Sequence, residues 1–522
     1  MKIFLRKGNI CLLIGILISG LLFLGSCKKK NTGSNPSGSN NGGKTNLTNE
    51  DSLKYLMYHI MQVSFVNGGR DSTYQLPTYY WNSAIPTLNP LNSIYANADS
   101  LLSTMKAFAM NPLTGLPYDH YSFLDRTGAV ANQLQNGQEN NFGMQVTYAL
   151  DINNNSYLYV LYADKNSPAG LAGITRGWQI TAVNGNSNIS YDGPSGTNTN
   201  TVVNAVYNSP TSSFTFLKPD NTSTTITLNT ATYNLNPILF DSVYTISGKQ
   251  VGYFVFYTFS SVYDSAGNAT LTQGVLNNEF AKFEAAGVKD VIVDLRYNGG
   301  GDVLTSQYID SLLAPSSVAG KVMYNYYYNS ALTTNEANLG LPSQVLFTGG
   351  GSLNLDNVFF IVSRSTASAS ELTLNNLKPY MNIKLVGDTT YGKPVGFFDF
   401  PVSDYDSSGN LQYLADLYAI DYETKNSLGQ GGYYSGIAPD QEAIDYVNVP
   451  WGDTADDNLV KIFNYISTGS FARTSGARLV NPENERRNLI QSMPNTQFNG
   501  MVDFRSGKKL ESKWLTMFRR KQ

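Results

Sequence analysis

The sequence predicts an α+β protein of several domains, in which a helical region is followed by a β domain and then by an α/β core. Three observations lead to this prediction. The chain has 522 residues, which corresponds to about three domains of ordinary size. Apolar residues first recur at helical spacing, then alternate as in strands, and finally form strand-like and helix-like segments in turn. Hydrophobic residues make up 42% of the chain, which is ample for packed cores.

The first 26 residues are typical of an export signal that ends in a lipidation site. Lys2, Arg6 and Lys7 precede an uncharged apolar run, which stops after small residues at Cys27. We therefore expect a lipoprotein signal peptide over 1–26 and lipidation of Cys27. The protein would then be lipid-anchored to a membrane of the cell envelope, on the periplasmic face or at the cell surface. A plain signal peptide or a single membrane anchor is the alternative.

Residues 27–46 are rich in Gly, Ser and Asn and are expected to form a flexible tether. Within it, Gly38, Gly43, Lys44 and Thr45 match the phosphate-loop pattern. A functional phosphate loop follows a strand and opens a helix. Because this tether offers neither, we expect no nucleotide to bind there.

Composition excludes several classes of function. The formal net charge is −3, which argues against a general nucleic-acid binder. The cysteines are Cys11, inside the signal, and Cys27, so disulfides and cysteine catalysis are not expected in the mature protein. With His59 and His120 as the sole histidines, we expect no multi-histidine metal site. We therefore expect no metal and no other cofactor.

The region 47–136 is predicted to be a mainly helical domain. Its first segment places apolar residues at helical spacing, namely Leu53, Leu56, Met57, Ile60 and Met61. A second helical segment holds Ser103 and Lys106 in the S-x-x-K spacing of penicillin-recognising hydrolases. This spacing arises by chance in many helices and no convincing partner motif follows, so catalysis there is the least favoured hypothesis.

Residues 137–230 are predicted to form a β domain. The stretch NSPAGLAGITRGWQITAVNG predicts a short helix, a glycine turn, a strand and a second tight turn. This order resembles the second half of a PDZ domain, a module that binds the C-terminus of a peptide as an additional strand. The resemblance implies that Phe142, Gly143 and Met144 form the substrate-binding loop and the start of its strand. A generic small β domain is the alternative.

From residue 231 to 470 strands and helices alternate, which predicts an α/β core with ligand groups at the C-terminal ends of its strands. One buried strand ends in the glycine loop DLRYNGGG, and another, NVFFIV, leads into STASASEL. Residues 471–522 are polar with a basic end and are expected to be a solvated tail. Contact of that tail with a membrane or with envelope polyanions is the alternative.

Ser368 is a candidate nucleophile on the residues alone. Ser368 and Glu371 fit the capping box S-x-x-E of a helix that begins at Ala369, so a purely structural role remains open. The N-terminus of a helix can also stabilise a developing oxyanion. Both histidines lie far away in the sequence, and a desolvated lysine is another known base. Lys393 lies in a turn after the next strand, which a strand–helix–strand unit brings back near the helix start.

Taken together, STASASEL, LVGDTTYGKPVG and DLRYNGGG resemble the signature of the C-terminal processing (tail-specific) peptidases, a family of Ser-Lys endopeptidases with a PDZ domain. The resemblance implies that Ser368 is the nucleophile and Lys393 the general base. It further implies that the main-chain N–H groups of Gly300 and Ala369 form the oxyanion hole. It also implies a crotonase-like α/β catalytic core and protein or peptide substrates recognised by their C-terminal tails.

The sequence departs from the family pattern at one informative position. Many members carry a glutamine four residues after the lysine, where it orients the amine, and here that residue is Phe397. His120 falls at a variable position of a family segment and is interpreted as structural. The sequence therefore predicts an envelope serine endopeptidase that cleaves unfolded or C-terminally tagged proteins through an acyl-enzyme. The alternative is a catalytically impaired PDZ scaffold that binds peptides.

Overall fold

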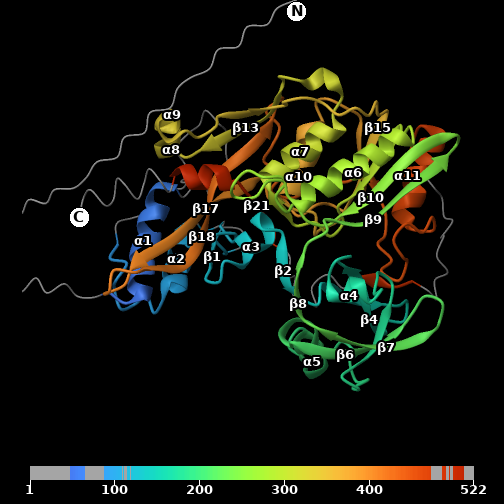
Figure 1. Cartoon of the computed structure of the whole chain (residues 1–522), viewed down its shortest axis with the longest axis horizontal. Coiled ribbons are helices and arrows are strands. Elements are labelled where there is room, and N and C mark those ends of the chain that lie inside the picture. The colour runs from blue at the N-terminus through green and yellow to red at the C-terminus, as the bar shows by residue number, and fades with distance from the viewer. Residues whose placement is uncertain are drawn as a thin grey trace, which may run out of the picture. The chain divides into compact units, whose positions relative to one another are not determined.

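The computed structural model describes residues 47–64, 88–108, 110, 115–117, 119–471, 485–488, 493 and 498–510. The predicted signal, Cys27 and the tether lie outside these residues, so their roles stay predictions. From Leu47 onward the chain forms one compact unit with a mixed α/β fold. Figure 1 shows its helices and sheets coloured along the chain.

A six-stranded sheet forms the centre of the predicted α/β core. Its strands, in spatial order, are β19 (Gln441–Glu442), β16 (Ile383–Gly387), β15 (Asn357–Val362), β11 (Asp290–Asp294), β10 (Lys249–Phe256) and β9 (Ile238–Ile246). All neighbours are parallel except β9, which pairs antiparallel with β10. Such a parallel sheet aligns the C-terminal ends of β11, β15 and β16 at one edge, where the predicted motif loops begin.

Both faces of this sheet are buried, and the side chains of β11 show why. Val291 and Val293 point into a core shared with the helices α6 (Leu271–Ala285), α7 (Val303–Leu313) and α10 (Ala369–Leu377). Ile292 between them points into a second core that includes Leu459 of α11 (Asp457–Thr468). Successive residues of a strand face opposite sides, so the continuous apolar run DVIVD belongs to a strand covered on both faces.

A second, seven-stranded sheet lies beside the first (Figure 1). Its path is β12 (Gly300–Asp302), β21 (Gly500–Val502), β17 (Val395–Tyr405), β18 (Leu411–Asn426), β13 (Val322–Tyr328) and β14 (Gln344–Leu346), and β1 (Phe123–Asp125) also pairs with β18. The short helix η2 (Ser316–Val318) precedes β13, and the short helices α8 (Ser330–Thr334) and α9 (Glu336–Leu339) follow it. This sheet carries both the glycine loop, at β12, and the strand that follows Lys393, at β17.

The predicted β domain has a sheet and an apolar core of its own. The sheet order is β20 (Arg487–Asn488), β3 (Met144–Leu150), β4 (Ser156–Ala163), β5 (Gln179–Val183), β6 (Thr211–Leu217) and β7 (Ser223–Asn229). The helical segments are α4 (Pro168–Leu171), α5 (Thr197–Val203) and η1 (Asn204–Asn208). Strand β2 (Gln138–Asn141), which precedes β3 in the chain, pairs antiparallel with β8 (Ala231–Asn234), which follows β7. Its core is formed by side chains such as Phe142, Val160 and Phe214.

The two predicted N-terminal helices are present as α1 (Asn49–Ser64) and α2 (Ala98–Lys106). A third helix, α3 (Ala129–Gln135), follows them in the same region. The helical spacing of Leu53 and Met57 reflects their burial, because both join the core under α6, α7 and α10. Helix α1 contacts β17 and β18 of the second sheet.

The expectation of a solvated C-terminal tail is wrong for residues 498–510. Met501 and Val502 are fully buried, and β21 lies between β12 and β17 as an inner strand of the second sheet. Leu510 is buried in the main core. The apolar stretch GMV is too short to predict a strand among polar neighbours, so its burial follows from tertiary packing. The rest of the tail after Leu510 lies outside the described residues.

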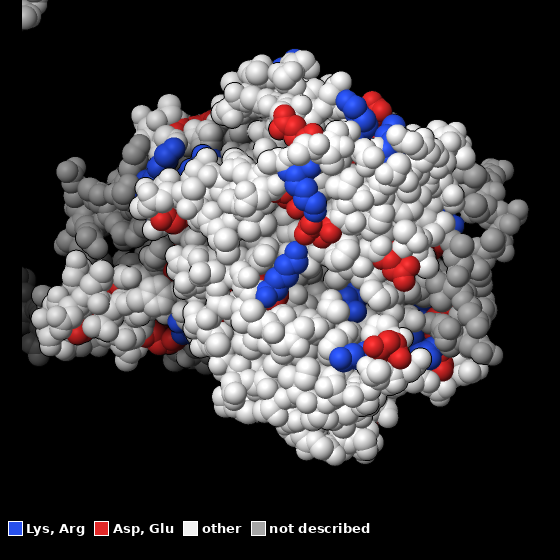
Figure 2. Space-filling view, turned by 45° about the vertical axis from the view of Figure 1, so that its right-hand side comes forward, with Lys and Arg blue, Asp and Glu red and all other residues white. Residues whose placement is uncertain are grey.

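Within the described ranges, no helix is long and apolar enough to cross a membrane. The surface in Figure 2 consists mostly of uncharged residues with scattered acidic and basic side chains. This matches a content of charged residues of 14%, below the roughly 25% of an average protein.

Candidate active site

Ser368 sits in the turn between β15 and α10 in a conformation that L-residues rarely adopt. Its φ is +59° and its ψ is −106°. The residue is fully buried, and its Oγ has no hydrogen-bond partner in the structure. A buried hydroxyl without a partner and a strained backbone each cost free energy, and such features gather at functional sites. The unpartnered hydroxyl and the strained backbone both indicate that Ser368, among the clustered serines, is the functional residue.

The neighbouring hydroxyls are instead used to hold two loops together. Ser370 Oγ donates to the carbonyl of Asn298 at 3.0 Å, and Thr366 Oγ1 donates to the carbonyl of Leu295 at 2.7 Å. Ser363 Oγ donates to a third carbonyl of the same loop. These bonds fix the serine turn against the glycine loop that follows β11.

Glu371 connects the serine turn to the lysine turn. Its Oε2 accepts the main-chain N–H groups of Ser368 and Lys393, each at 2.8 Å. Its Oε1 accepts the N–H of Gly392 at 2.7 Å and the hydroxyl of Thr390 at 2.5 Å. The bond from the N–H of Ser368 to Glu371 is the glutamate half of the predicted capping box. The side chain is fully buried, and burial raises the pKa of its carboxyl.

Lys393 is buried with its amine against aromatic rings. It is 1% exposed, and Nζ lies 3.9 Å from the ring centre of Phe397 and 4.7 Å from that of Tyr121. Nζ donates to the main-chain carbonyl of Asn499 at 2.8 Å. Burial lowers the pKa of the amine well below its usual value of 10.5, against the opposing effect of the acidic groups of Asp119 and Glu371. A lowered pKa provides the neutral amine that a general base requires.

Ser368 and Lys393 are therefore brought together through Glu371, but their side chains do not bond to each other. Ser368 Oγ has no partner, and the lysine amine is bonded to Asn499. One carboxylate oxygen lies within hydrogen-bond distance of both main-chain nitrogens.

The glycine loop lies directly beside the start of α10. A Cβ placed on Gly300 would come within 2.9 Å of the nitrogen of Ala369 and within 3.0 Å of the carbonyl oxygen of Ala367. Gly300 has a φ of +107°, which glycine adopts readily. The structure thus places the two predicted oxyanion donors next to each other. The N–H of Gly300 donates to Asn298 Oδ1 at 2.9 Å, so an oxyanion would have to replace that acceptor.

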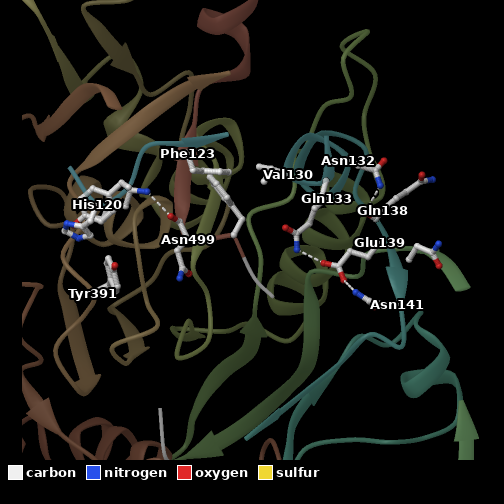
Figure 3. A pocket seen from close by; sticks show the side chains of 15 residues that line it. His120, Phe123, Val130, Asn132, Gln133, Gln138, Glu139, Asn141, Tyr391 and Asn499 are labelled. Carbon is white, nitrogen blue, oxygen red and sulfur yellow. Dashed lines mark hydrogen bonds between the residues drawn. The ribbon is translucent and has the colours of Figure 1, made fainter. Parts of the chain in front are cut away.

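A cavity of about 660 Å³ opens onto Lys393 (Figure 3). Its walls combine aromatic side chains with neutral amides, including Phe123, Tyr391, Asn132 and Gln138. Figure 3 shows one hydrogen bond ending on Asn499 and others that join Gln133, Glu139 and Asn141 on the opposite wall. His120 also lines this cavity, and its ring lies tilted against that of Tyr121, with 3.9 Å between the ring centres.

Phe142, Gly143 and Met144 line a second, smaller cavity of about 70 Å³ at the edge of β3. Glu139 and Asp164 also line it, and its walls include no lysine or arginine. The N–H of Gly143 is already taken by a side-chain oxygen of the preceding turn at 2.6 Å. Burial raises the pKa of Asp164 to about 6, against hydrogen bonds that lower it. The predicted loop is thus present, in an acidic setting that the sequence did not suggest.

Ser103 and Lys106 lie on α2 but form no pair. Ser103 is exposed, while Lys106 Nζ donates to the main-chain carbonyl of Ser122 at 2.8 Å. In the described part of the chain, no group of three or more His, Cys, Asp or Glu side chains could hold a metal ion.

Two buried arginines, which sequence analysis did not single out, join the β domain to the catalytic core. Arg176 bonds to Asp445 at 2.5 Å and to the hydroxyl of Tyr297 at 2.6 Å. Arg296 bonds to Asp294, Asp445 and Asp456. Trp451 lies under both guanidinium groups, 4.4 and 5.2 Å from its ring centre. The motif DLR thus has a structural role: its arginine anchors the base of the glycine loop.

Comparisons with known proteins place this site in a class. Residues 250–443 match the family model described as Peptidase family S41. A protein described as an S41 protease, from Bacteroides fragilis, is 20% identical with a TM-score of 0.54, covering 80% of this chain and 97% of its own. The photosystem II D1 C-terminal processing protease is 18% identical with a TM-score of 0.41, covering 79% and 97%. A search among curated proteins found no match.

The matched segment contains the glycine loop, the serine turn and the lysine turn. The chain therefore carries a peptidase core of the serine type. The match to peptidase family S41 over residues 250–443 confirms the family resemblance drawn from the motifs.

Proposed function

We propose that this protein is a serine endopeptidase that cleaves unfolded or C-terminally tagged proteins with Ser368 as nucleophile and Lys393 as general base. The observation that carries this proposal is the pairing across Glu371. It ties a buried, unbonded serine hydroxyl at a helix start to a buried lysine whose pKa is lowered. A hydroxyl needs a base to become a nucleophile, and a desolvated lysine is suited to that role.

The chemical steps follow from these groups. Ser368 Oγ attacks the scissile carbonyl carbon while its proton passes to the neutral amine of Lys393. The carbonyl oxygen becomes an oxyanion beside the N–H groups of Gly300 and Ala369, and the positive end of α10 adds to its stabilisation. The peptide C–N bond then breaks, and the leaving amine takes the proton from Lys393. Water attacks the acyl-enzyme in the same way, with Lys393 as base, and releases the serine.

The β domain would bind substrate tails in the manner of a PDZ domain. This part of the proposal is supported by the loop of Phe142 and Gly143 at the start of β3 and by the cavity that they line. Glu139 and Asn141 line both this cavity and the one at Lys393. A tail bound at β3 therefore lies next to the cleft in which cleavage would occur. Anchoring through Cys27 would place this activity in the cell envelope.

The test is proteolysis of an unstructured protein by the chain from residue 47 onward. We expect Ser368→Ala to abolish cleavage without lowering the unfolding temperature, because the hydroxyl makes no hydrogen bond. Ser103→Ala, at the exposed serine of α2, is the control and keeps its activity. Undiminished cleavage by Ser368→Ala would overturn the proposal.

The second candidate is a peptide-binding scaffold without catalysis. It is favoured by the bond between Gly300 N–H and Asn298, which occupies an oxyanion donor, and by Phe397 in place of a polar orienting group. A fluorophosphonate, which reacts with activated serines, separates the two. Tail-peptide binding without any adduct on Ser368 would establish the scaffold.

A further inference from the structure

The C-terminal segment 498–510 lies between the two halves of the proposed dyad site. Strand β21 pairs with β12 in parallel, with Gly500 opposite Gly300, and Val502 lies opposite Phe397 of β17. The N–H of Gly500 donates to the carbonyl of Gly299 at 3.0 Å. Strand β12, which belongs to the glycine loop, and strand β17, which follows Lys393, are thus joined through β21 and not directly.

This segment also supplies the partner of the lysine amine. Nζ of Lys393 donates to the carbonyl of Asn499 at 2.8 Å, and Phe498 packs on Phe397, whose ring covers the amine. A neutral amine has two N–H bonds and one lone pair. With one N–H held by a carbonyl, the direction of the lone pair is restricted. The carbonyl of Asn499 directly precedes β21, whose pairing in the sheet makes it a rigid acceptor for this purpose.

The segment is fastened at several points beyond the active site. Asp503 N–H donates to the carbonyl of Phe397 at 3.0 Å, and Asp503 Oδ2 accepts the buried hydroxyl of Tyr326 at 2.9 Å. Met501 and Leu510 are buried in the main core. These contacts keep the carbonyl of Asn499 in one place.

We propose that residues 498–510 are part of the active site and that the main-chain carbonyl of Asn499 positions the amine of Lys393 toward Ser368. This inference rests on the proposed function, since it names the group that orients the proposed base. In this proposal the carbonyl of Asn499 takes over the orienting role of the glutamine that Phe397 replaces. Asn499 is a positioning residue that acts through its backbone, so side-chain substitution at 499 leaves the carbonyl in place.

Two shortened chains test the proposal. Ending the chain at residue 497 removes the segment, whereas ending it at Leu510 keeps all the contacts described above and serves as the matched control. The readout is the rate at which an activated aryl ester acylates Ser368, with release of the aryl alcohol. We expect the control to react like the full chain and the shorter chain to react about 100-fold more slowly, the scale of a lost general base. A synthetic peptide of residues 498–510, added in excess, should restore the rate.

The pH dependence distinguishes positioning from a merely structural role. The neutral lysine is the active form, so acylation rises with pH through the pKa of Lys393. Burial is the main cause of its lowered pKa; Asp119 and Glu371 raise that pKa, and Lys106 lowers it. Removing Phe498 and its neighbours admits water to the amine and raises the pKa of Lys393, so we expect the rise in acylation rate to shift to higher pH. If the segment only held the fold together, the rate would fall because fewer molecules are folded, and the pH at which the rate rises would not change.

A point variant covers the case in which the shorter chain does not fold. In Gly500→Ala, the new Cβ would lie 2.3 Å from the ring of Phe498 and 2.8 Å from that of Phe397, so the rings over the amine must shift. We expect slower acylation and a rise in rate at higher pH. The matched control is Gly274→Ala in α6, where an added Cβ would meet nothing within 4 Å. An unchanged rate and pH profile in Gly500→Ala, or full acylation of a folded chain ending at 497, would overturn the inference. If the adduct instead persists in Ser368→Ala, the proposed function itself fails.

Discussion

The substitution Glu371→Gln tests whether one carboxylate assembles the serine and lysine turns. The carboxylate accepts four hydrogen bonds, two on each oxygen. A carboxamide keeps one acceptor oxygen and turns an NH₂ group toward the other pair. The least costly orientation directs NH₂ at Thr390, whose hydroxyl can accept, and leaves the N–H of Gly392 without an acceptor. A buried N–H without a partner costs about 1–3 kcal/mol, and the remaining bonds lose their charge assistance.

We therefore expect Glu371→Gln to lose about 2 kcal/mol or more of the interaction that holds the lysine turn. Removing a buried charge offsets part of this loss, since burial raises the pKa of the carboxyl. If the loss falls on the active arrangement, acylation of Ser368 by an activated aryl ester slows about 30-fold, at 1.4 kcal/mol for each factor of ten. Glu442→Gln, at an exposed acidic residue of β19, is the control.

The pH dependence of stability gives the second measurement. A carboxyl whose pKa is raised on folding binds its proton more tightly in the folded state. Its contribution to stability is then lost as the pH rises from the ordinary value of 4.5 through the folded pKa. Denaturant unfolding should show this decline in the parent chain and a smaller decline in Glu371→Gln. Full acylation together with an unchanged unfolding midpoint in the variant would refute the assembling role of Glu371.

Two further predictions concern the β domain. Arg176→Met should lower the free energy of unfolding by about 3–5 kcal/mol, because it breaks a buried ion pair; denaturant unfolding measures this. Burial would raise the pKa of Asp445, but Arg176 and Arg296 lower it to about 2, so the stability that these pairs contribute is lost as the pH falls toward 2. Binding of a free-carboxylate tail peptide should weaken as the pH rises through about 6, where Asp164 ionises beside the bound carboxylate. A peptide with an amidated C-terminus is the control, and equal pH profiles for the two peptides would contradict this prediction.

The parts of the site that the sequence predicted are those encoded within a few residues. The serine turn, the glycine loop and the lysine turn each lie within a continuous motif, and the parallel sheet brings their ends to one edge. The helix at 49–64 followed from its apolar spacing in the same way. Local patterns such as these survive in a single sequence because neighbouring residues determine them.

The capping box shows what a local pattern leaves out, although Ser368 is the N-cap residue of α10 as predicted. The pattern S-x-x-E predicts that Ser368 caps α10 with its hydroxyl, which requires an extended backbone at the cap. The structure has Ser368 at positive φ, and its hydroxyl is left without a partner. Glu371 reaches back to the N–H as expected, and then to the lysine turn as well. The same residues that would form a simple cap thus release the hydroxyl for chemistry.

The third group of the site could not be predicted because no local pattern encodes it. Asn499 lies 106 residues after Lys393, in a stretch whose composition is that of a polar tail. What places it is the pairing of Gly500 with Gly300 and the burial of Met501, both of which depend on a strand formed by three residues. The position of Phe397 had already indicated that some other group must orient the amine. The sequence thus shows that the usual orienting residue is missing at position 397. The group that we propose in its place, the main-chain carbonyl of Asn499, can be found only in the folded structure.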